Sequence, residues 1–182
     1  MGTKTLITAA ELEHTPKPLE GGGWELDEGE LVQVSPNSFQ QSKLIQKVYA
    51  ILQTWLRGKG LGAVAVDTWF EIEPHVVRAP DVAFIPANCL AAIDPRHAPK
   101  VVPALVVEVL GPSPSGRDVS RRIEQYREAG VPLIWVVDPD RLEVDVYGGR
   151  PLRTLTIGDT LDAAGILPGF SLALSQLFAE DE

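Results

Sequence analysis

The sequence predicts a single α/β (α+β) domain built on one mixed β-sheet flanked by two main helices. Three observations lead to this fold class. The chain has 182 residues, which suits one domain, and 45% of them are hydrophobic, enough to bury a core. Several short apolar or alternating runs are typical of strands, whereas two longer stretches have apolar residues at helical spacing. Cys89 is the one cysteine of the chain, so an internal disulfide or a cysteine-based zinc site is excluded.

Residues 1–23 are expected to form a flexible lead-in, and residues 24–182 the domain itself. Two prolines and the glycine run 21–23 interrupt regular structure in the lead-in, which leaves one helical turn around Thr8–Glu13. The N-terminal segment lacks the basic start and long apolar run of a signal peptide, and no stretch is apolar enough for a transmembrane helix. We therefore expect a cytoplasmic protein that does not enter a membrane.

A hairpin and a long helix open the domain. Two strands, Trp24–Leu26 and Glu30–Val34, flank Asp27-Glu28-Gly29, a composition typical of a tight turn. The segment Ser35-Pro36-Asn37-Ser38 favours a helix start. The apolar residues after it recur at helical spacing and predict a helix that ends at Gly58.

Three strands and a loop are predicted next. The strands cover residues 63–66, 68–73 and 82–85, and a loop rich in proline, aspartate and alanine covers 86–100. Ala104–Leu110 follows as a short apolar run that stops at a Gly-Pro pair, which is typical of a buried central strand.

The second main helix and three further strands complete the domain. Residues 116–129 are predicted to be helical, because Val119, Ile123 and Tyr126 share one stripe and a glycine stands where the helix would end. Strands are expected at 133–137, 142–147 and 152–157. The tail, residues 161–178, is expected to be loop plus a short packed helix.

Three charged residues occupy positions where apolar ones are expected. Asp81 stands at the start of one strand, and Glu108 interrupts an otherwise apolar strand, where an unpaired buried carboxylate would cost several kcal/mol. Arg122 lies near the apolar stripe of the second helix and therefore faces the sheet. The pattern predicts either a site for a hard divalent ion or a structural Glu108–Arg122 ion pair, and spacing alone favours neither.

A metal site of this composition would suit phosphodiester hydrolysis. Mg²⁺ prefers oxygen ligands and is commonly bound through one or two carboxylates together with substrate phosphates. Such an ion makes a bound water easier to deprotonate and offsets charge on phosphoryl oxygens.

A set of short segments then points to a known family. They are, in chain order, Trp24–Pro36, Ala79–Ile85, Leu105–Ser113, Asp118–Tyr126, Ala129–Pro132, Ile134–Pro139 and Leu167–Phe170. From about residue 24 to 178 the chain resembles the Uma-type endonucleases, a former domain of unknown function within the PD-(D/E)XK nuclease superfamily. The resemblance implies the restriction-endonuclease-like fold and a nuclease that uses Mg²⁺ or Mn²⁺ to cut DNA.

The resemblance also implies roles for individual residues. Asp81 would be the metal-binding aspartate, Glu108 the acidic member of the second motif, and the backbone carbonyl of Val109 a further ligand. Glu30, from the family's Gly-Glu, would be another acidic ligand, with a solvated hairpin carboxylate as the alternative. Leu110 stands where the superfamily motif has lysine.

Two further positions depart from the family pattern. The lysine that this family carries on the next helix corresponds to Arg122, which stays charged and so can contact a phosphate but cannot act as a base. The family's histidine in the first helix corresponds to Gln41, which can hydrogen-bond but cannot carry protons at neutral pH. Arg122 and Gln41 are nevertheless the expected catalytic residues beside Asp81 and Glu108.

Three functions remain open on this basis. The first is a Mg²⁺- or Mn²⁺-dependent DNA endonuclease, the second a catalytically impaired nuclease fold that binds nucleic acid or protein, and the third a small-molecule phosphohydrolase. The net charge of −9 argues against a strongly basic DNA-binding surface, but residues 31–137, with 11 lysines and arginines and nine acids, have a net charge of +2. The resemblance further suggests a homodimer.

Overall fold

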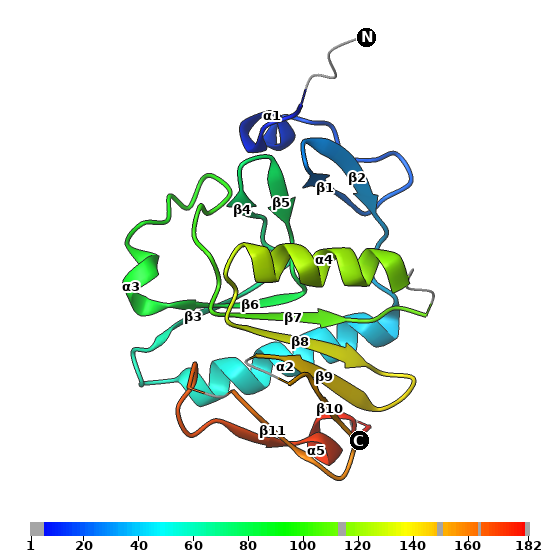
Figure 1. Cartoon of the computed structure of the whole chain (residues 1–182), viewed down its shortest axis with the longest axis vertical. Helices are drawn as coiled ribbons and strands as arrows, with labels where there is room; N and C mark the ends of the chain where they lie inside the picture. Colours follow the sequence, from blue (N-terminus) through cyan, green and yellow to red (C-terminus); the bar gives the residue numbers. More distant parts are fainter. Residues whose placement is uncertain (1–5, 113–115, 149–150, 164, 181–182) are drawn as a thin grey trace.

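A six-stranded mixed sheet runs through the middle of the molecule, in the order β10-β9-β8-β7-β6-β3 (Figure 1). The computed structural model describes residues 6–112, 116–148, 151–163 and 165–180. β7 pairs in parallel with β8, and the other neighbouring strands are antiparallel. The six strands are β3 (Gly62–Val66), β6 (Val82–Pro86), β7 (Leu105–Val109), β8 (Leu133–Asp138), β9 (Glu143–Tyr147) and β10 (Arg153–Leu155). The predicted fold class is confirmed, and β7 is the central buried strand that its apolar run indicates.

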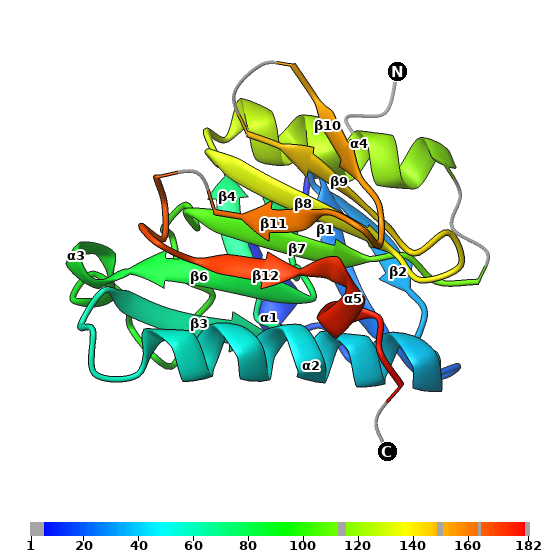
Figure 2. The same cartoon turned by 90° about the horizontal axis from the view of Figure 1, so that it is seen from below.

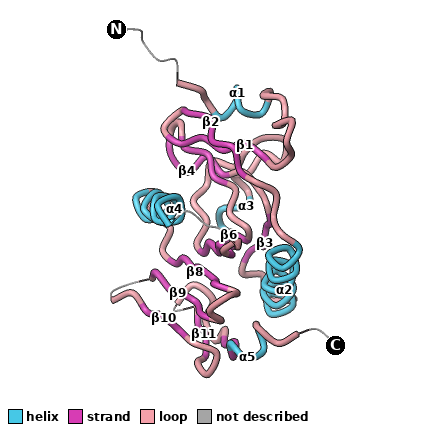
Figure 3. The backbone as a smooth tube through the Cα atoms, turned by 90° about the vertical axis from the view of Figure 1, so that its right-hand side faces the viewer, coloured by secondary structure: helices cyan, strands magenta, loops and turns pink. Residues whose placement is uncertain are grey.

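Two helices cover opposite faces of this sheet (Figures 2 and 3). α2 (Phe39–Leu56) is capped by Ser38, and its buried residues join the larger core cluster with Leu105, Val107 and Val109 of β7. α4 (Gly116–Glu128) contributes to a second cluster on the other face, with Val106 of β7. Since side chains alternate along a strand, residues 105, 107 and 109 face α2, and residues 106 and 108 face α4. Both predicted helices are confirmed within two residues at each end.

The predicted hairpin belongs to a second, smaller sheet of order β2-β1-β5-β4. Its strands are β1 (Gly23–Asp27), β2 (Glu30–Val34), β4 (Phe70–Glu73) and β5 (Val76–Arg78). The turn between β1 and β2 puts Glu28 at φ 50° and Gly29 at φ 80°, a conformation that glycine adopts without steric cost. The sheet brings β5, and hence the segment leading into β6, beside β1.

The lead-in is packed on this smaller sheet from its first helix onward. The helical turn predicted around Thr8–Glu13 is present as α1 (Ala9–Glu13), which Thr8 caps. Ala9 and Leu12 pack with Leu26 and Val77 in a third core cluster. Leu12 is fully buried. The division at residue 24 stays a prediction, but the described lead-in contributes to the core.

Three details differ from the sequence prediction. β5 was not expected, since three residues are too few to show a periodicity. The predicted loop over 86–100 contains the short helix α3 (Ala87–Leu90). The tail forms an antiparallel strand pair, β11 (Thr160–Asp162) with β12 (Ser171–Ala173), before the expected short helix α5 (Leu174–Leu177).

Among the described residues, no helix combines the length and the apolar character needed to cross a bilayer.

Candidate active site

Asp81 and Glu108 come from neighbouring strands and meet on the face of the central sheet that α4 covers. Glu108 shares this face with Val106, because the two lie two residues apart on β7. β6 and β7 pair with Val82 opposite Val107. Continuing this antiparallel register by one residue puts Asp81, directly before β6, opposite Glu108. The structure therefore brings together two acids that are 27 positions apart in sequence.

Asp81 is a buried carboxylic acid whose ionisation is opposed by its surroundings. It is 8% exposed, and its Oδ2 accepts a hydrogen bond of 2.6 Å from the backbone N–H of Val109. Burial and the negative charge of Glu108 raise the pKa of Asp81 to about 7, although the Val109 N–H and the charge of Arg122 act in the opposite direction. Near neutral pH, added positive charge at this point would favour the ionised form of Asp81.

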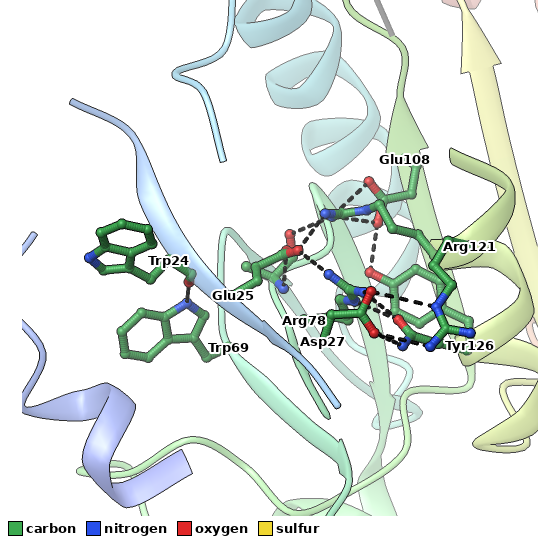
Figure 4. Close-up of polar contacts among 11 residues, drawn as sticks. Trp24, Glu25, Asp27, Trp69, Arg78, Glu108, Arg121 and Tyr126 are labelled. Atoms are coloured by element: carbon green, nitrogen blue, oxygen red, sulfur yellow. Dashed lines mark hydrogen bonds and ion pairs between the residues drawn. The ribbon is translucent and has the colours of Figure 1, made fainter. Parts of the chain in front are cut away.

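Glu108 is held by two side chains of α4. Nη2 of Arg122 donates to both carboxylate oxygens, at 3.0 and 3.1 Å, and the hydroxyl of Tyr126 donates to Oε1 at 2.6 Å (Figure 4). Burial raises the pKa of Glu108, while Arg122 and Tyr126 partly counteract the rise. The ion pair between Glu108 and Arg122, one of the two sequence-based alternatives, is therefore present.

Arg122 joins two carboxylates and a backbone carbonyl. Its Nη1 donates to Oε2 of Glu25 at 2.6 Å, and Nη2 also lies 3.4 Å from the carbonyl oxygen of Ala79. Within the part of the chain that the structure describes, its buried Nε has no hydrogen-bond partner. Burial alone would lower the pKa of Arg122, but the negative charges of Glu108 and Glu25 hold it well above its usual value. Arg122 therefore stays a cation inside the site.

Sequence reasoning missed the polar cluster behind Arg122. Glu25 is 1% exposed and accepts from Nη1 of Arg78 at 2.8 Å and from the N–H of Ala79 at 2.9 Å. Arg78 also donates to Gln125 of α4 through Nε, at 2.8 Å, and lies 3.3 Å from Asp27. The one sequence signal was Arg78 itself, a charge directly after two valines and before Ala79-Pro80-Asp81.

Gln41 reaches the backbone of the expected metal ligand. Its Oε1 accepts from the N–H of Ser38 at 2.9 Å, which completes a capping box at the start of α2. Its Nε2 donates to the carbonyl oxygen of Val109 at 3.1 Å. Gln41 thus lies at the site, in contact with the carbonyl that the family resemblance makes a metal ligand.

Glu30 lies on β2 of the smaller sheet, whereas Glu108 lies on β7 of the central sheet and Asp81 directly precedes β6. Glu30 is exposed at the start of β2, where it pairs with Asp27 across the hairpin. In the described ranges of the chain, no three His, Cys, Asp or Glu residues gather into a group suited to a metal ion. The structure therefore brings together Asp81, Glu108 and the Val109 backbone, and the role of Glu30 stays a prediction.

A small cleft of about 100 Å³ opens beside these residues. Its lining consists of Glu108, Val109, Leu110, Gly111, Val119 and Arg122. Leu110, at the position of the superfamily lysine, thus borders the cleft with an apolar side chain. A Cβ on Gly111 would lie 3.0 Å from the amide atoms of Gln41, so glycine allows the Gln41 side chain to approach the segment that follows β7. The cleft exposes a carboxylate, backbone and a guanidinium together, a set suited to a metal ion and a phosphate.

The chain is similar to known proteins in sequence and in fold. A family model described as "Uma2: Putative restriction endonuclease" matches residues 10–175. The fold is similar to the crystal structure of a putative nuclease belonging to DUF820 from Anabaena variabilis, with a TM-score of 0.79 at 17% sequence identity. That similarity covers 94% of this chain and 97% of the other and, at this identity, concerns the fold. No protein of curated function matches the sequence.

Proposed function

The chain belongs to the Uma2 family, described as putative restriction endonucleases, and on this premise we propose that it is a divalent-metal-dependent endonuclease that hydrolyses phosphodiester bonds in DNA. The observation that carries the proposal is the meeting of Asp81 and Glu108 on adjacent strands, with the Val109 backbone between them, beside an open cleft. Two facing carboxylates, of which Glu108 raises the pKa of Asp81, are typical of sites that hold a cation.

The residues present fit a hard divalent ion. Asp81, Glu108 and the Val109 carbonyl supply oxygen donors, the type that Mg²⁺ and Mn²⁺ take. Oδ1 of Asp81 makes no hydrogen bond with any described residue, which leaves this oxygen available as a ligand for the ion. When bound, such an ion would lower the pKa of an attacking water and neutralise charge on the phosphoryl oxygens.

The chain's own side chains would orient the substrate and the ligands. Arg122, a permanent cation at the cleft, would contact the scissile phosphate through its guanidinium. Tyr126 holds one oxygen of Glu108, and Gln41 holds the Val109 carbonyl through its amide. Neither Arg122 nor Gln41 can accept a proton from water near neutral pH, so their contribution would be positioning and charge stabilisation.

A second candidate function has its own supporting observation. Both oxygens of Glu108 already accept from Arg122, and the Val109 carbonyl already accepts from Gln41, so two of the three proposed ligands are engaged within the protein. A nuclease fold that has lost catalysis and binds nucleic acid or protein would have this arrangement. The substitutions of lysine by Arg122 and of histidine by Gln41 would then be the cause of the lost activity.

Plasmid cleavage in Mg²⁺ or Mn²⁺ separates the two candidates. If the proposal is right, the wild-type protein cuts DNA, Asp81→Asn and Glu108→Gln abolish cutting, and Arg122→Lys raises it. Asp140→Asn, which changes an exposed turn aspartate, is the matched control and keeps full activity. DNA binding without cleavage in any metal would favour the impaired fold, and hydrolysis of a small chromogenic phosphodiester alone would favour a phosphohydrolase. Size-exclusion chromatography of the same samples tests the homodimer.

A further inference from the structure

Glu25 is a buried carboxylate that contacts Arg122 of the candidate site and the backbone segment that leads to Asp81. It lies on β1, far from Asp81 and Glu108 in sequence, and is 1% exposed. One oxygen accepts from the backbone N–H of Ala79, and the other accepts from two guanidinium groups, of Arg78 at 2.8 Å and of Arg122 at 2.6 Å (Figure 4). Neither the family description nor the sequence motifs assign it a role.

We propose that Glu25 is a positioning residue of the nuclease site, which holds the Arg122 guanidinium where it can meet the scissile phosphate of DNA. The inference rests on the proposed nuclease function. Glu25 would act through Arg122 and would not bind the metal ion.

The two terminal nitrogens of Arg122 bind different carboxylates, and this supports the positioning role. Nη1 is bound to Glu25, whereas Nη2 is bound to Glu108. If Glu108 turns one or both oxygens to a divalent ion, the bond from Nη1 to Glu25 is unaffected. Glu25 would then keep Arg122 inside the site while its second amino group becomes free to donate to a phosphate oxygen.

The same pair of side chains fixes the peptide that leads to Asp81. Glu25 accepts from the N–H of Ala79 at 2.9 Å, and Arg122 lies 3.4 Å from the carbonyl oxygen of Ala79. Ala79 is two residues before Asp81, with a rigid proline between them. Glu25 therefore links the position of the metal-binding aspartate to the position of the phosphate-binding arginine.

Charge balance argues against a purely structural pair. Arg78 pairs with Glu25, and its other acidic partner, Asp27, also pairs with Arg121, so Glu25 has a neutralising guanidinium besides Arg122. Arg122 is neutralised by Glu108. The bond between Glu25 and Arg122 thus adds a constraint on the guanidinium beyond what neutrality needs. A role as metal ligand is disfavoured, because three donors already occupy the two oxygens of Glu25.

The test is a double-mutant cycle in single-turnover DNA cleavage with Mn²⁺, using Glu25→Gln, Arg122→Ala and the double variant. The expected result for Glu25→Gln is a loss in kcat of about 10- to 100-fold, the size typical of a misplaced catalytic group. Mn²⁺ affinity should stay unchanged, because the amide oxygen of the new side chain can still accept from the Ala79 N–H. In the Arg122→Ala background the same substitution causes no further loss. Equal losses in both backgrounds, or lost Mn²⁺ binding, would overturn the inference.

Two variants guard against a loss caused by folding. Arg78→Met removes the other cation on Glu25 but leaves Arg122 in place, so it lowers the melting temperature and keeps kcat. A kcat loss equal to that of Glu25→Gln would reveal a general structural effect and contradict the inference. If Glu25→Gln does not fold, the double variant Glu25→Gln/Arg78→Met is used in its place in the cycle. This variant removes both charges of the Glu25–Arg78 pair and so leaves no unpaired guanidinium at that position.

A readout on the metal-free protein separates this inference from the nuclease proposal. Nitrogen-15 NMR of the Arg122 guanidinium reports how freely it rotates. We expect hindered rotation of the Nη1 amino group in the wild type and in Arg78→Met, and faster rotation of that group in Glu25→Gln, where Glu108 still holds Nη2. An absence of cleavage by the wild type would contradict the proposed function, whereas an unchanged Arg122 signal in Glu25→Gln would contradict the positioning role whatever the activity.

Discussion

Replacing Asp81 by asparagine is expected to stabilise the metal-free protein above pH 7 and to change little near pH 4. The pKa of this carboxyl is about 7 in the folded protein against 3.8 as its ordinary value. Between these values the folded state binds more protons than the unfolded state, so stability is full below pH 4 and falls as the pH rises to 7. A difference of about three pKa units, at 1.36 kcal/mol each, corresponds to about 4 kcal/mol.

Asparagine has the same shape but no charge to bury. Its side-chain oxygen can still accept from the Val109 N–H, the one hydrogen bond that Asp81 makes with described residues. Asp81→Asn should therefore abolish this pH-dependent loss without opening a cavity. The full 4 kcal/mol is an upper figure, since relaxation of the site reduces such penalties.

Urea denaturation in EDTA at pH 4.5 and pH 8.5 measures the effect. We expect Asp81→Asn to unfold at a higher urea concentration than the wild type at pH 8.5, with a free energy of unfolding larger by about 2–4 kcal/mol. At pH 4.5 the two proteins should differ little. The control Asp140→Asn, at an exposed turn, should show no difference at either pH. Equal stability of Asp81→Asn and wild type at pH 8.5 would refute the idea that Asp81 is a carboxyl kept neutral by its surroundings.

Three further changes test other contacts. Arg122→Ala should destabilise the protein by about 3–5 kcal/mol in urea unfolding, because it leaves Glu108 buried without its paired cation. Leu12→Ala should cost about 2–5 kcal/mol by the same assay, since Leu12 is fully buried, and a neutral result would show that the lead-in is dispensable. Gly62→Ala should lower the melting temperature, because its Cβ would lie 2.1 Å from a carbonyl oxygen of β6 at φ 153°; an unchanged value would contradict the close pairing of β3.

The sequence predicts the central sheet and both long helices because their signals are local. Apolar periodicity marks α2 and α4, and short valine-rich runs mark β7 and β8. β5, β11 and β12 have three residues each, too few for a periodicity to appear. β5 forms through pairing with β4 and with the distant β1, whereas β11 and β12 pair with each other.

The residues of the candidate site likewise differ in whether the local sequence marks them. Asp81, Glu108 and Arg122 stand out because each breaks an apolar pattern, and they do meet. Glu25 gave no such signal, since an acid between two apolar residues of a hairpin strand is typical of a solvent-facing position. Its burial depends on β5 and α4, which supply Arg78 and Arg122 from distant parts of the chain. Only the tertiary structure reveals that contact.

Calorimetric titration with Mn²⁺ tests the central claim most directly. The claim is that Asp81 and Glu108, with the Val109 carbonyl, hold a divalent ion. The account predicts one binding event in the wild type and in Asp140→Asn, and none in Asp81→Asn or Glu108→Gln. Affinity should also rise from pH 6 to pH 8, as the Asp81 proton, with its pKa of about 7, no longer competes. Binding of equal strength in Asp81→Asn, or no binding in the wild type, would contradict the account.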